Sequence, residues 1–309
     1  LRPRWRPAFE LILIPLVLPL GPLKDIPHLI YQQESLYNYI QVVQLPDGTR
    51  QLVLNEGDAI HSIYYPDTSR VLTGWYWDYF LAAPYFNPDF KASQLHRVGI
   101  IGLAGGTIAH QFTQVYGPVP IDGVEIDPAI VAVGQKYFGM TEPNLHVSVQ
   151  DGRTYIETTK QHYDLVAIDA FQQPYIPFQL TTREFFTSIR SHLSPNGVVV
   201  LNTAHTTHDY RLVQAFVNTM SQVFANVYTF NVPGTFNTEI MATVRPTSID
   251  TFRQNLAQFE PSSVMGQVAN EVLPVVQQGH SDGGLVFTDD KAPIEEITDQ
   301  LLLDYIQQP

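Results

Sequence analysis

The stretch from Arg97 to Asp127 constrains the fold of this chain more than any other part of its sequence. It predicts a buried strand, a glycine-rich turn, a helix and a second strand that ends at Glu125, which together form half of a doubly wound α/β sheet. The glycines of the turn are Gly102, Gly105 and Gly106. Glycine lets the backbone approach a ligand closely, and an acid at the end of the second strand can accept hydrogen bonds from a ribose diol. The spacing G-x-x-G-G differs from the G-x-G-x-x-G of dinucleotide sites, which argues against a dinucleotide; a tight turn without a ligand is the alternative.

Acidic residues follow the predicted strands of this sheet at the points where the strands end. The strands beyond the first pair are expected at Leu145–Val149, Asp164–Ile168 and Gly197–Leu201. Because ligands bind beyond the carboxyl ends of such strands, the acids there should converge on one crevice. They are Glu125, Asp127, Asp151 and Asp169. An Asp after a strand often caps a helix, which we favour for Asp127, and both roles stay open for Asp151. Asp169 precedes a proline-interrupted loop, so a functional role is favoured there.

Longer runs of the chain carry, in order, the motifs of one enzyme family. The runs are VEIDPAIVAVGQKYF, VSVQDGRTYI, YDLVAIDAF, IPFQLTTREFF and LSPNGVVVLN. They resemble the spermidine synthase (polyamine aminopropyltransferase) family over Tyr37 to Ile297, and the ending FTDDKAPIEE resembles bacterial members fused to membrane segments. The resemblance implies a class I S-adenosylmethionine-dependent methyltransferase-like fold, that is, a Rossmann-type doubly wound α/β sheet with a small N-terminal β-hairpin module.

The same resemblance implies roles for individual residues. Glu125 would hold the ribose hydroxyls, and Asp151 and Gly152 would contact the adenine. Asp169 would be the catalytic acid–base residue, and Tyr76 falls where the family keeps an active-site tyrosine. The remaining candidates are Gly102, Gly105 and Gly106 for cofactor binding and His61, Tyr79 and Gln172 for substrate binding. For His61, a hydrogen-bonded core histidine is the alternative.

Three positions depart from the family pattern, and all of them concern groups that hold amines. Gly105 stands where the synthases carry an Asp, Gln172 stands where a second loop acid is expected, and Phe236 is the aromatic nearest to a late tyrosine. Aliphatic amines titrate near ~10, so a diamine is dicationic at neutral pH and needs carboxylates to offset its desolvation. We therefore expect putrescine to be a poor acceptor unless other acids have taken over this role. Those acids would be Asp78, Asp289 or Asp290.

The charge balance and residue usage limit the partners. Lys+Arg 17 against Asp+Glu 30 gives a net charge of −13, which argues against a nucleic-acid backbone as partner. The chain has no cysteine, and its 10 histidines lack the spacing of a zinc site. We expect no metal site and no nucleic-acid partner.

The amino end is apolar but broken by prolines. Ala8 to Leu23 is shorter than the about 20 residues that a membrane helix needs. One interpretation is the end of a membrane-spanning region, which makes the rest the cytoplasmic-side domain of a membrane protein. The other is an arm that packs on its own domain or on a second subunit of a homodimer. We expect a cytoplasmic location and divide the chain into this arm (1–30), a small β module (31–90) and a nucleoside-binding catalytic domain (91–309).

Weaker patterns predict the elements around this core. Alternation around Pro46–Thr49 predicts a hairpin, and Asp209–Phe224 has helical spacing. The remaining expectations are an antiparallel pair at Val227–Val232 and Glu239–Val244, and helical or partly helical cover at Gln254–Phe259 and Glu271–Gln278.

The hypothesis that these observations favour is aminopropyl transfer from an S-adenosyl sulfonium to a small amine. The donor, as co-substrate, would be decarboxylated S-adenosylmethionine or S-adenosylmethionine. Asp169, with Tyr76, would take the proton from the incoming amine. Methyl transfer at the same nucleoside site is the alternative within enzymes. A non-catalytic domain that binds adenosyl nucleosides and is tethered to membrane is the alternative from another class.

Overall fold

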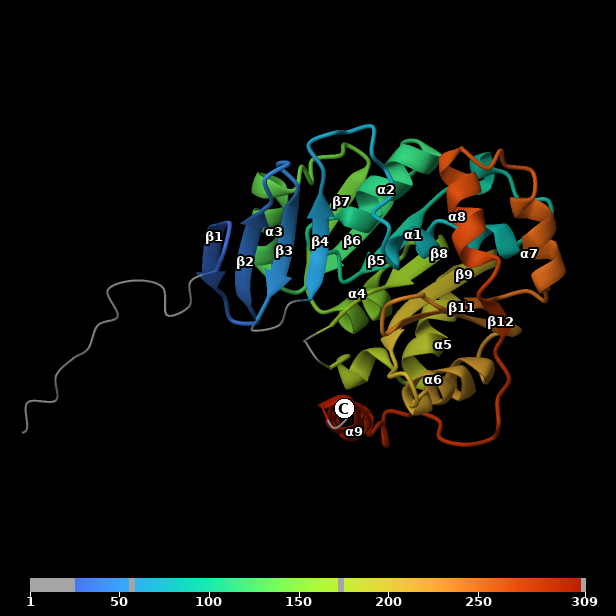
Figure 1. The fold of residues 1–309 in the computed structure, drawn as a ribbon. Coiled ribbons are helices and arrows are strands. Elements are labelled where there is room, and N and C mark those ends of the chain that lie inside the picture. The colour runs from blue at the N-terminus through green and yellow to red at the C-terminus, as the bar shows by residue number, and fades with distance from the viewer. Residues whose placement is uncertain (1–25, 56–58, 172–174, 307–309) are drawn as a thin grey trace, which may run out of the picture.

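A large mixed sheet and a smaller antiparallel sheet make up the protein (Figure 1). The computed structural model describes residues 26–55, 59–171 and 175–306. The apolar arm at Ala8–Leu23 and the site candidate Gln172 lie outside the described residues. Within the described ranges, no helix is long and apolar enough to cross a membrane.

The large sheet has eight strands in the order β12-β10-β11-β9-β8-β5-β6-β7. Its parallel strands are β5 (Val98–Ile101), β6 (Ile121–Glu125), β7 (Leu145–Val149), β8 (Tyr163–Ile168) and β9 (Leu193–Ala204). Its antiparallel strands are β10 (Asn226–Asn231), β11 (Asn237–Thr243) and β12 (Val276–Gln278). The chain builds outward from β5 in both directions, so a switch point lies beside β5, where doubly wound sheets bind ligands. The α/β fold predicted from the sequence is therefore confirmed.

Helices cover both faces of this sheet. They are α1 (Trp77–Phe80), α2 (Thr107–Tyr116), α3 (Pro128–Tyr137), α4 (Gly152–Thr158), α5 (Arg183–Ser191), α6 (Arg211–Ser221), α7 (Ile249–Leu256), α8 (Val264–Val272) and α9 (Ile294–Ile306). Short 3-10 turns span Ala83–Phe86, Ala92–Gln94 and Phe178–Leu180. In β8, Leu165 and Ala167 join the core beneath α1, α2, α7 and α8, whereas Val166 and Ile168 join the core beneath α5, α6 and α9. A strand buried on both faces must be apolar throughout, which explains the unbroken hydrophobic run that revealed it.

The smaller sheet packs its apolar side chains on α3. Its strands are β1 (Leu29–Glu34), β2 (Tyr39–Gln44), β3 (Arg50–Leu54) and β4 (Ile60–Tyr64), paired in sequence order and antiparallel. Ile40 and Leu52 from this sheet form one buried cluster with Ile130 and Val133 of α3. The predicted hairpin is the β2–β3 pair, and β1 and β4 extend it on either side. The boundary near residue 90 stays a prediction.

The last third of the chain agrees with the sequence in part. The predicted antiparallel pair is present as β10 and β11. The segment Glu271–Gln278, expected as helical or partly helical cover, is helical only to Val272, where α8 ends, and Val276–Gln278 forms the edge strand β12 on β10. The three-residue strand is too short for a period of two to show in the sequence. Helix α9 had not been predicted.

Candidate functional site

A cavity of about 350 Å³ opens where β5, β6 and β8 end, within the size range of small-molecule sites. Gly102 and Glu125 line it from the ends of β5 and β6, and Asp169 follows β8. Asp151 lines it from the start of α4, and His61 of β4 lines it from the smaller sheet. The structure thus brings together acids that lie far apart in the sequence, at the crevice where the strand-end pattern predicted them.

Glu125 is held in place by the backbone around it. Its side chain is only 7% exposed. Its Oε2 accepts a hydrogen bond from the Ala104 amide at 2.9 Å, and its Oε1 accepts one from the Asp127 amide at 3.1 Å. Burial raises the pKa of Glu125, and these two backbone donors oppose the rise. The carboxylate keeps further lone pairs, so Glu125 can accept the predicted hydrogen bonds from a ribose diol in the cavity.

The glycine turn is shaped by close backbone contacts. Gly102 has φ +85°, and a Cβ there would lie 2.3 Å from the carbonyl oxygen of Asp169. The Gly105 amide donates to Ser62 Oγ at 2.8 Å, and Gly106, with φ +91°, precedes the first residue of α2. Gly102 lines the cavity, whereas Gly105 and Gly106 face the smaller sheet around Ile63. Contact of those two glycines with a cofactor stays a prediction.

Both aspartates that could cap a helix do so. Asp127 accepts from the Ala129 amide and begins α3. Asp151 accepts from the Thr154 amide at 2.8 Å and begins α4, while it also lines the cavity. Capping through one oxygen leaves the other available to a ligand, so the two roles left open for Asp151 are compatible. Gly152 follows, and a Cβ there would lie 2.4 Å from Ile101 Cγ2.

Asp169 is the most densely hydrogen-bonded acid that lines the cavity. Tyr76 Oη and Trp77 Nε1 donate to its Oδ2 at 3.1 and 3.0 Å, and Asn202 Nδ2 donates to its Oδ1 at 2.9 Å. Burial raises the pKa of Asp169, and these three donors oppose the rise. The predicted pair of Asp169 and Tyr76 is thus in direct contact. Trp77 and Asn202 had not been predicted, although Trp77 is adjacent to Tyr76 and Asn202 lies at the end of a strand, where site residues concentrate.

The substrate-binding candidates fall in different surroundings. His61 lines the cavity. Tyr79 is 3% exposed and meets Phe230 edge-on, with 6.3 Å between ring centroids, and burial raises the pKa of Tyr79 to about 12. Tyr79 follows Tyr76 and Trp77 in the sequence, and it is not among the described residues that line the cavity. Its contact with an acceptor stays a prediction, as does that of Gln172.

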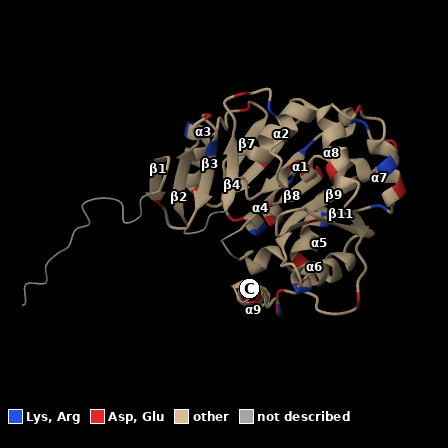
Figure 2. Ribbon diagram, in the orientation of Figure 1, with Lys and Arg blue, Asp and Glu red and all other residues tan. Residues whose placement is uncertain are grey.

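The cavity carries negative charge without a basic counterpart. Its carboxylates come from Glu125, Asp151, Asp169 and, from α9, Glu295. Among the described residues that line it, none is Lys or Arg. Figure 2 shows Lys and Arg interspersed with Asp and Glu over the described ribbon rather than gathered on one element. Such a cavity favours cationic ligands over phosphates. Glu295 was missed because α9 had not been predicted.

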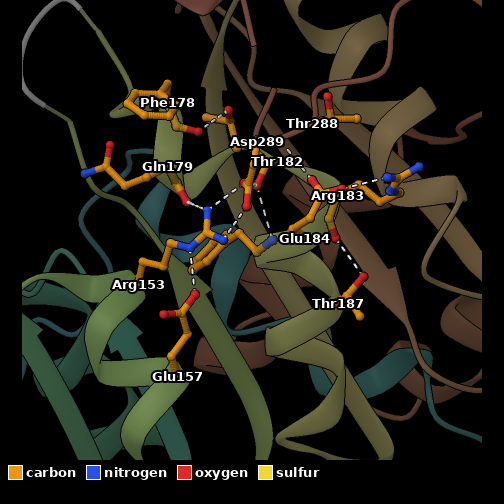
Figure 3. A network of polar contacts seen from close by, with 12 residues as sticks. Arg153, Glu157, Phe178, Gln179, Thr182, Arg183, Glu184, Thr187, Thr288 and Asp289 are labelled. Carbon is orange, nitrogen blue, oxygen red and sulfur yellow. Dashed lines mark hydrogen bonds and ion pairs between the residues drawn. The ribbon is translucent and has the colours of Figure 1, made fainter. Parts of the chain in front are cut away.

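Two acids considered as replacement amine holders are engaged elsewhere. Asp78 accepts from the Thr73 amide and hydroxyl at 2.9 and 2.8 Å, from the Gly74 amide at 2.8 Å and from Gln111 at 2.5 Å. It therefore fixes the loop that leads into Tyr76. Asp289 holds Arg153 through two bonds, of 2.7 and 2.6 Å, in the network of Figure 3.

The Figure 3 network fixes one wall of the cavity. Thr182 Oγ1 also donates to Asp289, at 2.6 Å, and Arg153 reaches the Gln179 carbonyl at 3.4 Å. Gln179 lines the cavity, and its side chain lies 3.5 Å from Asp151. The segment around Asp289 thus positions the wall without entering the cavity. In the part of the chain that the structure describes, no cluster of three or more acidic or histidine side chains could hold a metal ion.

Comparison with known proteins gives one family. A model described as the spermine/spermidine synthase domain matches residues 87–255, more than half of the chain. A protein named "Probable polyamine aminopropyl transferase" from Bifidobacterium longum is 33% identical over 301 residues, which are 90% of this chain. This chain spans 65% of that relative's length. A "Polyamine aminopropyltransferase" from Vibrio vulnificus is 33% identical over 215 residues, covering 66% of this chain and 68% of that protein.

A solved structure has the same fold. The crystal structure of a "probable spermidine synthase" from Corynebacterium glutamicum superposes with a TM-score of 0.68 at 19% identity, covering 87% of this chain and 98% of that one. The strand-end acids, the hydrogen-bonded Asp169–Tyr76 pair and the family match all point the same way. The chain belongs to the spermine/spermidine synthase family.

Proposed function

We propose that this protein transfers an aminopropyl group from decarboxylated S-adenosylmethionine to a small amine. The observation that carries the proposal is Asp169, an acid held by Tyr76, Trp77 and Asn202 at the edge of a cavity that also contains Glu125. The names of the relatives from Bifidobacterium longum and Vibrio vulnificus support the same reaction class.

The chemistry needs a base and water exclusion rather than an acid. The amine nitrogen attacks the aminopropyl carbon bound to the sulfonium, a new C–N bond forms, and the C–S electron pair returns to sulfur. The leaving thioether, methylthioadenosine, is neutral and needs no proton. The nitrogen must arrive unprotonated or lose its proton, and Asp169 can take that proton. Glu125 and Asp151 would hold the nucleoside so that sulfur and amine are aligned.

The charge of the cavity supports the decarboxylated donor. S-adenosylmethionine carries an α-carboxylate, which would enter a cavity lined by four carboxylates with no described Lys or Arg beside it. Decarboxylated S-adenosylmethionine has a sulfonium and an ammonium and no carboxylate, so each of its charges is opposite to that of the cavity. This charge pattern supports the decarboxylated donor over methyl donors that retain the carboxylate.

A product assay with both donors tests the proposal. The protein is incubated with decarboxylated S-adenosylmethionine or S-adenosylmethionine and a set of amines, and the nucleoside products are separated by mass spectrometry. We expect methylthioadenosine from the decarboxylated donor. Formation of S-adenosylhomocysteine would instead identify a methyltransferase. Tight nucleoside binding without either product would identify a binding domain.

A further inference from the structure

Glu239 is a fully buried acid without hydrogen bonds. It lies on β11 and is 0% exposed. Neither of its carboxylate oxygens has a hydrogen-bond partner among the described residues. Buried polar groups in folded proteins are nearly always hydrogen-bonded. A buried acid without hydrogen bonds therefore indicates a ligand that supplies the missing donors.

The strand register places Glu239 beside the catalytic acid. Glu239 is paired with Asn202 on the neighbouring strand β9 and with Phe230 on the neighbouring strand β10. Directly opposed residues of antiparallel strands project from the same face of the sheet. Asn202 donates to Asp169, and Phe230 packs against Tyr79, so Glu239 lies among the residues around the reacting centre.

The electrostatic surroundings agree with this position. Burial raises the pKa of Glu239 well above its ordinary value, and the nearby Asp169 raises it further. The charge of Glu239 in turn contributes to the raised pKa values of Tyr76 and Tyr79. Burial therefore disfavours the charged form of Glu239 in the absence of a cation. A bound ammonium would supply both the charge and the N–H donors that it lacks.

We propose that Glu239 binds the second ammonium of a diamine acceptor, the nitrogen that does not react. This inference rests on the proposed aminopropyl transfer. Glu239 would supply the charge that this chain lacks at Gly105 and Gln172, where the family resemblance implies acids. Asp78 and Asp289 are already bonded to groups of the folded chain, Asp78 to Thr73 and Gly74 and Asp289 to the Arg153 guanidinium, whereas Glu239 has no hydrogen-bond partner among the described residues.

Binding of the ammonium is coupled to a proton. As the R–NH₃⁺ group arrives, it lowers the raised pKa of Glu239, the proton that the acid form carries passes to solvent, and a carboxylate–ammonium pair remains. Glu239 does not line the 350 Å³ cavity, which Asp169 borders. The amine chain must therefore pass Asp169, and the Tyr76 hydroxyl, now bonded to Asp169, must turn aside. The aromatic rings of Tyr79 and Phe230 then exclude water from the pair.

Kinetics with a diamine and a monoamine of equal length test this role. Butylamine has only the reacting nitrogen, so it cannot use Glu239. Glu239→Gln keeps the size and removes the charge, and we expect it to raise KM for putrescine by about 10- to 100-fold, the scale of one charged hydrogen bond. KM for butylamine should not change. Glu271→Gln is the matched control, because Glu271 is an exposed glutamate of α8 that also acts on Tyr79.

Calorimetry gives a readout that does not depend on turnover. Putrescine is titrated into the protein–methylthioadenosine complex at neutral pH in two buffers of different ionisation enthalpy. The wild type should release more protons per amine bound than Glu239→Gln. Unchanged methylthioadenosine affinity in the variant shows that it is folded.

The outcomes separate this inference from the proposed function. A wild type that yields no methylthioadenosine with any amine overturns the proposed function, and the inference with it. An active wild type that uses butylamine as well as putrescine overturns the inference alone. So does a Glu239→Gln variant with unchanged KM for putrescine and an unchanged proton count, which would make Glu239 a residue of the core.

Discussion

At the scale of single residues, the proposed function assigns the proton transfer to Asp169. Asp169→Asn keeps the shape and removes the capacity to accept a proton, so we expect turnover to fall by about 10²- to 10⁴-fold, the usual contribution of a general base. Methylthioadenosine should still bind, because Glu125 and Asp151 are unchanged. Steady-state kinetics and calorimetry on the same preparation check both statements. Near-full activity of this variant would place the base elsewhere, with His61 as the next candidate in the cavity.

A second residue-scale prediction concerns Glu239 and the pH dependence of stability. The groups that face it are Asp169, Tyr76 and Tyr79, and none of them is a cation. The pKa of Glu239 in the folded state lies well above the ordinary 4.5. A raised pKa means that the contribution of this group to stability is complete below pH 4.5 and is lost as the pH rises through the folded-state pKa.

Glu239→Gln removes this titration, so the variant should gain stability relative to the wild type as the pH rises. Without amine, the difference in Tm between variant and wild type should increase as the pH rises from 4.5 through the folded-state pKa and then level off. Thermal unfolding across this range measures it. The control is Glu271→Gln, which leaves the buried acid in place. A difference that does not vary with pH would contradict a neutral, buried Glu239.

At the scale of elements, close contacts with neighbouring residues shape the glycine turn. Gly102→Ala would put a Cβ 2.3 Å from the Asp169 carbonyl oxygen at φ +85°, so we expect it to destabilise the fold by at least about 1–3 kcal/mol. Gly105→Asp, which would restore the acid of related synthases, meets Ser62 Cβ at 2.9 Å. It should lower stability without improving diamine use.

Denaturant unfolding of Gly102→Ala and Gly105→Asp measures the expected loss of stability. Amine kinetics on Gly105→Asp measures its use of diamines. Gly234→Ala is a suitable control, since its φ is also positive, at +74°, but a Cβ there meets nothing within 4 Å. It separates the cost of backbone conformation from the cost of the contact. A stable Gly105→Asp variant with improved use of putrescine would contradict the geometry of this turn.

The elements also show which parts of the site the sequence could reveal. Parallel strands are buried on both faces, so β5 and β8 were visible as apolar runs, and the acids at the strand ends followed from the topology. Glu239 was invisible as a site residue because only the β9–β11 register places it opposite Asn202. Register depends on contacts between segments far apart in the chain, which no local pattern encodes.

At the scale of the whole molecule, charge selects the ligands. The chain has a net charge of −13, and the described lining of the cavity contains four carboxylates and no Lys or Arg. This field attracts a dicationic donor and a cationic acceptor, and salt screens it with a Debye length of about 10 Å at 0.1 M. Methylthioadenosine is neutral and fills the same nucleoside site without responding to the field.

We therefore expect kcat/KM for decarboxylated S-adenosylmethionine to fall by about 3- to 10-fold between roughly 0.05 and 0.5 M salt. The Kd of methylthioadenosine should stay constant over the same range, which makes the neutral product an internal control. Stopped-flow or initial-rate measurements at several salt concentrations provide the first quantity, and calorimetry provides the second. Parallel losses for both ligands would mean that salt acts on the fold of the cavity instead of on its charge. A kcat/KM that does not depend on salt would mean that the four carboxylates are compensated by groups outside the described lining.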